Sequence, residues 1–233
     1  MNEQKRPARL QAVDGLVERL LRSGIDGFGP LAGAAAVAAD ARAATPTEAD
    51  AVDRIVRNHV RLAAAEGFLT GLGGFVTMIV ALPANVWAFH LLATRMVAAI
   101  AAVHGHDVSR DEVRAAVLLT LAGDDAGDIL RRAGAVAGQG KLTSLALRGL
   151  PPSALMAVNK GIVFRLLVRF SRSGLARFGK LVPGIGGVIG GGIDAYLMRQ
   201  IGQRARADFG RSAGEALRGR DTVTHRQRAG GIA

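Results

Sequence analysis

The stretch GFLTGLGGFVTMIVALPANVWAFHLLAT occupies residues 67–94 and contains no aspartate, glutamate, lysine or arginine. It is longer than the roughly 20 apolar residues with which a helix crosses a bilayer. Gly71 and Gly74 interrupt the stretch. Pro83 is expected to end one helix and to let another begin near Asn85. Two half-length pieces favour a re-entrant or deeply buried hairpin over one straight span.

A second uncharged segment, residues 181–193, contains six glycines. Gly186 and Gly190 are four residues apart, a spacing that lets two helix backbones approach closely. Gly187 and Gly191 repeat this spacing. The segment is too short to cross a bilayer, so we expect it at a close helix crossing. Two alternatives stay open for both uncharged segments: burial in a soluble core, or insertion into a membrane as a hairpin.

The remaining sequence favours helices. Residues 8–22 carry an apolar stripe at helical spacing, and Pro30 suits the first turn of an Ala-rich helix over residues 30–43. Thr45-Pro46-Thr47-Glu48 and Ser109-Arg110-Asp111-Glu112 are each typical of a capping box that begins a helix. No run alternates apolar and polar residues as a strand does. The predicted fold class is all-α, a multi-helix bundle with the two Gly-rich apolar segments packed at its centre or dipping into a membrane.

The chain divides by composition into three parts. We expect an amphipathic helix over residues 1–23, a helical domain over 24–211 and a basic, disordered tail over 212–233. The 233 residues include no cysteine, which excludes disulfides, thiolate nucleophiles and Cys-based metal sites. The first residues lead into an amphipathic stretch and not into the apolar core of a signal peptide. We therefore expect a cytoplasmic protein, peripheral to or partly inserted in the inner membrane.

The net charge of +11 is concentrated in one block, because residues 129–193 contain ten bases and no acid. Within this block a helix is expected over residues 153–178, with arginines on one face and Leu, Ile and Phe on another. Such a helix suits an anionic membrane surface, although an ordinary bundle helix with a solvated basic face has the same pattern. With one Tyr, one Trp and no recognition motif, the block does not favour nucleic acid. The predicted lipid-binding residues are Lys160, Arg165, Arg169, Arg172, Arg177 and Lys180.

Motifs for catalysis or metal binding are incomplete throughout the chain. Asp124-Asp125-Ala126-Gly127-Asp128 resembles a magnesium-diphosphate motif but has no second motif to face it. His104 and His106 have no evident third ligand, and Gly138-Gln139-Gly140-Lys141 lacks the Ser or Thr that ends a P-loop. We predict no catalytic residue, no metal and no cofactor, so an enzyme ranks third, below membrane binding and the enclosure of a hydrophobic ligand and above nucleic-acid binding.

Three polar residues lie in or beside the apolar stretches: His90, Arg95 and Asp194. An unpaired buried charge is costly, so Arg95 and Asp194 are predicted to pair across the two Gly-rich elements. Such pairs are most often structural, and a proton-relay or ligand role is the alternative.

The order and spacing of several short motifs resemble those of the EcsC family of bacterial proteins. The motifs are Gly27-Phe28-Gly29-Pro30, residues 67–74, Leu82-Pro83-Ala84-Asn85, Gly105 with Asp107, Val158-Asn159-Lys160, and residues 179–187 followed by Gly190, Asp194, Gly202, Ala205 and Phe209. The chain departs from the family pattern at His104 and His106, where aromatics are expected, and at Asn85, where Asp is common. The resemblance implies a link to an ABC transporter or another membrane protein, because the family is named after a protein encoded beside one. It implies no established biochemical activity.

These observations predict a non-enzymatic, membrane-associated helical protein of the cytoplasmic face. It would bind anionic lipid through the basic helix. The family resemblance, and no other observation, implies a membrane transporter as its partner. The alternative is a soluble helical protein that encloses a lipid or another hydrophobic ligand.

The basic block generates the first testable prediction. The protein should sediment with phosphatidylglycerol vesicles in preference to phosphatidylcholine vesicles, because cations near an anionic surface contribute about 1 kcal/mol each. Changing Arg165, Arg169 and Arg172 to Glu should abolish this preference, and raising the salt concentration should weaken it in the original chain. Absence of binding to either vesicle by the folded protein would contradict the lipid-binding assignment.

Overall fold

The computed structural model describes residues 8–72, 74–123 and 185–229. In this part of the chain it contains six helices and, outside them, an isolated β-bridge between Phe28 and Leu31. The helices are α1 (Ala8–Ile25), α2 (Ala34–Ala43), α3 (Glu48–Leu72), α4 (Gly74–Val103), α5 (Asp111–Ala122) and α9 (Ile185–Ala229). The predicted all-α class is confirmed.

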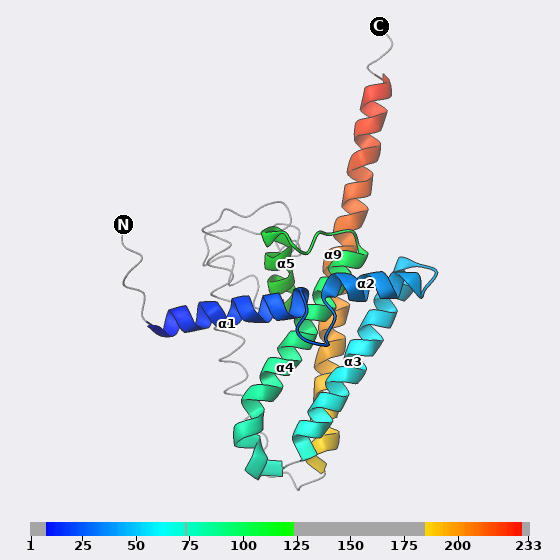
Figure 1. The fold of residues 1–233 in the computed structure, drawn as a ribbon. Helices are drawn as coiled ribbons and strands as arrows, with labels where there is room; N and C mark the ends of the chain where they lie inside the picture. Colours follow the sequence, from blue (N-terminus) through cyan, green and yellow to red (C-terminus); the bar gives the residue numbers. More distant parts are fainter. Residues whose placement is uncertain (1–7, 73, 124–184, 230–233) are drawn as a thin grey trace.

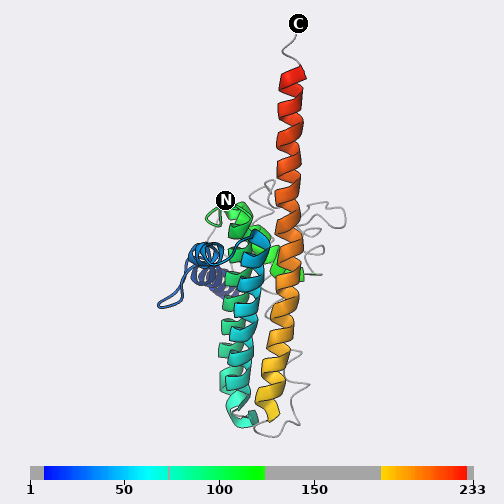
Figure 2. The ribbon, with the colours of Figure 1, turned by 90° about the vertical axis from the view of Figure 1, so that its right-hand side faces the viewer.

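The long helices α3, α4 and α9 lie side by side, and α1, α2 and α5 gather around the C-terminal half of α4 (Figures 1 and 2). The C-terminal part of α4 is the centre of the core, because Met96 and Val97 and the residues that follow as far as Ala101 are fully buried. Ile55 of α3 and Met198 and Phe209 of α9 are buried against it. Each large apolar side chain removed from water in this way contributes about 1.5–3 kcal/mol to folding.

The start of α3 is fixed by a cap two residues later than predicted. The backbone N–H of Asp50 donates to Thr47 Oγ1 at 3.1 Å, and the Thr47 hydroxyl donates to the Asp50 carboxylate at 2.6 Å. The capping residue is therefore Thr47, with Glu48 as the first helical residue. Thr45, which we predicted as the cap, instead donates to the Ala41 carbonyl at 2.7 Å, at the end of α2.

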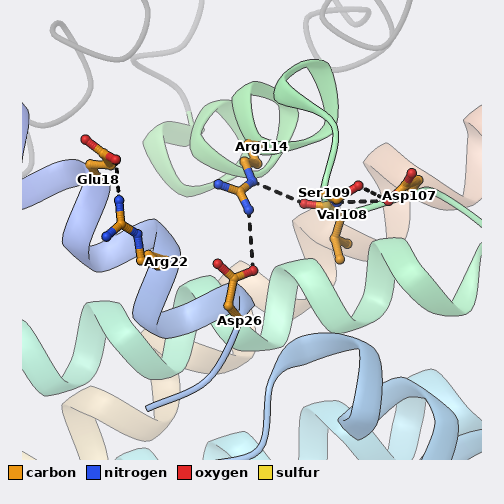
Figure 3. A network of polar contacts seen from close by, with 7 residues as sticks. All are labelled: Glu18, Arg22, Asp26, Asp107, Val108, Ser109 and Arg114. Atoms are coloured by element: carbon orange, nitrogen blue, oxygen red, sulfur yellow. Dashed lines mark hydrogen bonds and ion pairs between the residues drawn. The ribbon is translucent and has the colours of Figure 1, made fainter.

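The start of α5 agrees with the prediction, but its predicted capping box is absent. α5 begins at Asp111 after Arg110, whose side chain makes no cap hydrogen bond. Ser109 is turned back toward Asp107, because its N–H and hydroxyl donate to Asp107 Oδ1 at 2.9 and 2.6 Å (Figure 3). The Ser109 side chain therefore stabilises the turn before α5 and does not cap the helix as the motif predicted. Asp111 and Glu112 still favour this helix end through its dipole.

α5 is tied to the end of α1 by one arginine. Arg114 donates from Nε to the Val108 carbonyl at 3.3 Å and contacts Asp26 Oδ1 at 3.4 Å (Figure 3). On α1 itself, Arg22 pairs with Glu18 one turn earlier at 2.5 Å. The pair of Arg114 and Asp26 links α5 to the end of α1, whereas the pair of Arg22 and Glu18 lies within α1. Each contributes little to stability because water screens it.

The helix predicted from Pro30 begins instead at Ala34. Phe28 and Leu31 exchange two backbone hydrogen bonds, of 3.1 and 3.0 Å, and so form a tight turn before the helix. Gly27 makes this turn possible, since its φ of 97° is one that other residues rarely adopt. The chain can enter a helix only after the turn has closed.

The prediction that Pro83 ends a helix is wrong. α4 runs without interruption from Gly74 to Val103, and the chain reverses between Leu72 and Gly74 instead. Proline removes one hydrogen bond from a helix interior. Burial of the second half of α4 in the core outweighs that loss.

α9 also differs from expectation, because it continues to Ala229 through the segment predicted to be a disordered tail. Residues 212–229 contain many helix-forming residues and no proline. Starting a helix is costly, but extending one that has already formed gains one hydrogen bond for each residue that is fixed. The preceding part of α9 therefore favours helix in this segment, an effect that the composition of the segment alone does not show. Figure 2 shows this part of α9 extending well past the other helices.

α3 and α9 meet at glycines that leave no room for a side chain. A Cβ atom on Gly190 would lie 2.7 Å from the Gly67 carbonyl oxygen, and one on Gly191 would lie 2.6 Å from the Ala64 oxygen. Real Cβ atoms essentially never come this close. The close helix crossing predicted for Gly190 and Gly191 is thus made with α3, near the start of the uncharged stretch.

This crossing generates a prediction with a matched control on the same helix. Gly190→Ala should lower the free energy of unfolding by about 1–3 kcal/mol, because the added methyl group overpacks the contact. Gly192→Ala should instead raise it by up to about 1 kcal/mol, since nothing lies within 4 Å of that position and alanine favours a helix. Urea unfolding of both variants measures the difference. Equal changes in the two would contradict the close contact.

Candidate functional site

A group of exposed apolar side chains surrounds the crossing of α3 and α9. We call these residues the apolar tip: Phe68 and Leu69 of α3, and Val188, Ile189, Ile193 and Tyr196 of α9. They lie at the end of the molecule where α3 ends and where α4 and α9 begin (Figures 1 and 2). Leu69 is 67% exposed and Val188 68%, although each belongs to a largely uncharged segment.

The glycine contact explains why these side chains face outward. Gly187 and Gly191 are buried, and Gly190 and Gly191 lie against α3. Helical geometry then turns the intervening Val188 and Ile189 toward the outside of the crossing. An exposed cluster of large apolar side chains is characteristic of an interaction site, because contact with water is unfavourable for it.

Two carboxyl groups lie directly behind the apolar tip. Asp194 of α9 reaches so close to Gly67 that a Cβ atom there would collide with its carboxylate. The neighbouring Glu66 is half-buried, and both of its carboxyl oxygens are inaccessible to solvent and have no hydrogen-bond partner. Burial, and then the charge of Asp194, raise the pKa of Glu66 to about 7. Near neutral pH this carboxyl group therefore binds and releases a proton.

Further into the bundle lie two buried histidines and an arginine. Burial lowers the pKa of both His59 and His90 to about 4, so both rings are neutral at pH 7. His59 donates from Nδ1 to the Ile55 carbonyl at 2.8 Å, since a carbonyl oxygen can only accept. Its Nε2 is buried without a partner, near enough to Arg95 for that charge to lower the pKa of His59 further.

Arg95 itself is partly buried, with Nε and Nη1 enclosed and without hydrogen-bond partners. Burial lowers the pKa of this guanidinium group. The charge of Asp194 raises the pKa of Glu66, and the charge of Arg95 lowers the pKa of His59. The predicted pair between Arg95 and Asp194 stays a prediction.

The other predicted site residues differ in how far the structure describes them. Gly71 lies in the last turn of α3, Gly74 begins α4, and Gly186 and Gly187 lie in the first turn of α9. Pro83 lies inside α4. The predicted lipid-binding cations all lie outside the described residues: Lys160, Arg165, Arg169, Arg172, Arg177 and Lys180.

Sequence reasoning missed Glu66 and His59. Glu66 is the last charged residue before the uncharged stretch, and that position was the signal available. His59 lies on the apolar stripe of α3, where a histidine is a common core residue. The environment of Glu66 depends on Asp194 of α9, and that of His59 depends on Arg95 of α4, so neither can be recognised from the sequence around it.

The described residues include no group of three or more Asp, Glu or His side chains that could hold a metal ion. His104 Nδ1 lies 3.8 Å from Glu48 Oε2. The ring of His106 packs edge-on against the ring of Phe209, and the two ring centroids are 5.5 Å apart. These two histidines therefore serve the packing between α3, α4 and α9, and both are partly buried.

One stretch of the described helices, Val86–Val103 of α4, is long and apolar enough to cross a membrane by length and composition. However, 61% of this window is buried inside the protein. A core helix of a soluble protein has the same properties, so this helix by itself does not indicate a span.

A comparison with models of protein families matches residues 46–210 to the EcsC protein family. The match covers α3, α4, α5 and the part of α9 that packs in the bundle. No curated protein and no solved structure matches the chain.

The buried histidines predict an acid-labile fold. The unfolded chain binds a proton at each histidine near pH 6.5, whereas the folded chain does so only near pH 4. The stability that each provides is therefore complete above pH 6.5 and is lost as the pH falls toward 4, by up to about 3 kcal/mol per histidine. His90→Leu should flatten the pH dependence of urea unfolding between pH 6.5 and 4 by about one proton.

His104→Gln is the comparison for that variant, because His104 is only half-buried and should remove a smaller part of the dependence. If His90→Leu leaves the slope unchanged, the neutral buried state assigned to His90 is contradicted.

Proposed function

The chain belongs to the EcsC protein family, and from this premise we propose that it is a non-enzymatic protein that binds the cytoplasmic face of an anionic membrane. Its apolar tip enters the bilayer interface while the bundle of α3, α4 and α9 stays folded outside the hydrocarbon core. The observation that carries the proposal is the exposure of Leu69 and Val188, one in each of the two uncharged segments.

The composition of the apolar tip supports insertion. Its members are Phe, Leu, Val, Ile and Tyr, and the nearest charged residues along α3 and α9 are Glu66 and Asp194. Removing one such side chain fully from water is favourable by about 1.5–3 kcal/mol, so several acting together favour association with a bilayer. Burying them in the membrane requires no unfolding of the core, since they are already outside it.

The tyrosine of the apolar tip also suits a membrane interface. The single Tyr of the chain, Tyr196, is 62% exposed, and Gln200 donates to its hydroxyl at 2.5 Å. The single Trp, Trp87, lies further along α4 and is half-buried there. Tyr and Trp are enriched where apolar and aqueous phases meet, because their rings are apolar and carry one polar group.

Charge adds a second source of affinity. The block of ten bases without an acid, residues 129–193, ends within the first turns of α9 and so is joined by the chain to the apolar tip. Cations held near anionic headgroups complement an inserted apolar group, and stable peripheral binding generally needs two such contributions. A membrane transporter is the class of partner that the family resemblance adds to this proposal.

A pair of variants tests the role of the apolar tip. Leu69→Glu combined with Val188→Glu should reduce partition onto phosphatidylglycerol vesicles at least tenfold, because about 1.4 kcal/mol of lost binding energy suffices for that factor. Phe28→Glu is the matched control, since Phe28 is 67% exposed on the turn before α2. Co-sedimentation at low and high salt measures the partition.

Each outcome of that experiment bears on the proposal. Loss of binding in the double variant alone, with all variants melting normally, supports insertion of the tip. Equal loss in the Phe28→Glu control would indicate a general effect of added negative charge. If the original chain binds no vesicle, the alternative of a soluble protein that encloses a hydrophobic ligand takes precedence.

A further inference from the structure

Three exposed arginines lie near the apolar tip, on the same two helices that form it. They are Arg57 and Arg61 of α3 and Arg199 of α9, and we call them the arginine cluster. In the part of the chain that the structure describes, their side chains form no ion pair and no hydrogen bond. Arg22 and Arg206 differ, because each of them pairs with a carboxylate. The three cations of the cluster are therefore free to bind an anionic partner.

The packing of α3 against α9 gathers the arginine cluster on one side of the bundle. Each arginine directly follows a residue that packs in the core, in chain order Val56, Val60 and Met198. In two antiparallel helices, the residues that follow such contact residues lie on the same side of the contact, because both helices are right-handed. α4 packs against both helices and covers the opposite side.

The register between the two helices places the three arginines at nearly the same height. The glycine crossing aligns the helices at the apolar tip, and further along Val56 lies opposite Gly202. Arg199 precedes Gly202 by three residues and is therefore level with the turn that joins Arg57 and Arg61. Those two are four residues apart, which corresponds to about 6 Å along the helix axis. The cluster thus occupies about one helical turn.

The height of the arginine cluster above the apolar tip matches the headgroup layer of a bilayer. Phe68 follows Arg61 by seven residues, so the two lie on the same side of α3, about 10 Å apart along its axis. Tyr196 precedes Arg199 by three residues on α9. The headgroup layer is about 5–8 Å thick on each side of the hydrocarbon core. Arginine side chains are long enough to direct their charged ends into such a layer.

Nearby carboxylates do not neutralise the arginine cluster. Glu66 directly precedes the contact residue Gly67 and so lies toward α4, on the side opposite to the arginines. The Asp194 carboxylate reaches Gly67 inside the crossing, and Asp53 is held in an ion pair with Arg206. The exposed side of α3 and α9 beside the tip is therefore positively charged, which complements an anionic headgroup layer.

We propose that Arg57, Arg61 and Arg199 bind the phosphate groups of anionic lipids while the apolar tip lies in the bilayer interface. This inference rests on the proposed function and adds a lipid site to it, with the axes of α3 and α9 steeply inclined to the membrane plane. Guanidinium groups suit this ligand, because they donate two parallel hydrogen bonds to phosphate oxygens. The site lies outside the basic block of residues 129–193, except that α9 belongs in part to both.

Removal of the three charges tests the lipid site. The triple variant Arg57→Gln, Arg61→Gln, Arg199→Gln should partition at least tenfold more weakly onto mixed vesicles of phosphatidylglycerol and phosphatidylcholine, because each cation near the surface adds to binding. Co-sedimentation measures the partition, and thermal melting checks that the variant is folded. The weakening should shrink as the salt concentration rises, since salt screens these charges.

A matched control removes the same number of charges at the other end of the bundle. It replaces three exposed arginines of α1 and of the turn before α5 by Gln: Arg19, Arg22 and Arg110. α1 and α5 gather around the C-terminal half of α4, away from the tip (Figure 1). Charges further from a surface than the screening length of about 8–10 Å interact with it little, so the control should bind within twofold of the original chain.

The outcomes distinguish this inference from the proposed function. Weaker binding by the cluster variant alone supports the lipid site. Equal binding by the cluster variant and the control overturns the site and leaves membrane association intact. Absence of vesicle binding by the folded original chain overturns both. If the triple variant fails to fold, Arg61→Gln and Arg199→Gln are measured singly; each should weaken partition about threefold, and no weakening in either overturns the site.

Two other anions are compared with the lipid in the same series. Inorganic phosphate and duplex DNA are each titrated into the original chain and into the cluster variant in the absence of vesicles. Saturable binding of either anion that the cluster variant loses, together with unchanged vesicle binding, overturns the assignment of the arginines to lipid. Loss of vesicle binding without such a site for free phosphate or DNA supports it.

Discussion

The backbone contact between Gly67 and Gly190 is the constraint from which the rest of the arrangement follows. Neither position has room for a Cβ atom, so α3 and α9 are locked in one register. Further along the same interface, that register places Gly202 against Val56, where a Cβ atom would lie 3.0 Å from the valine methyl groups. It also pairs Arg206 with Asp53. One close approach thus aligns the interface over several turns and turns the apolar side chains beside it outward.

Small residues take the same role throughout the core. Only 4% of the chain is aromatic, and many of the most completely buried side chains are alanines, such as Ala34, Ala51 and Ala99. Helices that meet through alanine and glycine approach closely and make many short-range dispersion contacts despite their small side chains. Such interfaces tolerate enlargement poorly, because no long, flexible side chain can yield to an added group.

The sequence predicted features that depend on neighbours along the chain and missed those that depend on distant helices. Helical periodicity identified the all-α class, and the glycine spacing identified Gly190 and Gly191 as crossing residues. Pro83 was misjudged because the burial that compensates for it involves α3 and α9. The role of Glu66 was not predictable locally, because its pairing depends on Asp194, far away along the chain.

The packing of α9 divides this helix into two parts. From Gly190 to Phe209 it is held against α3 and in the core, at the glycine crossing, at Gly202 beside Val56 and at Phe209. The roughly 20 residues that follow add about 30 Å of helix at 1.5 Å per residue. Figure 2 shows this far end projecting beyond the other helices. Since the first part is fixed in the bundle, α9 acts as an anchored post that carries its C-terminal residues away from the core.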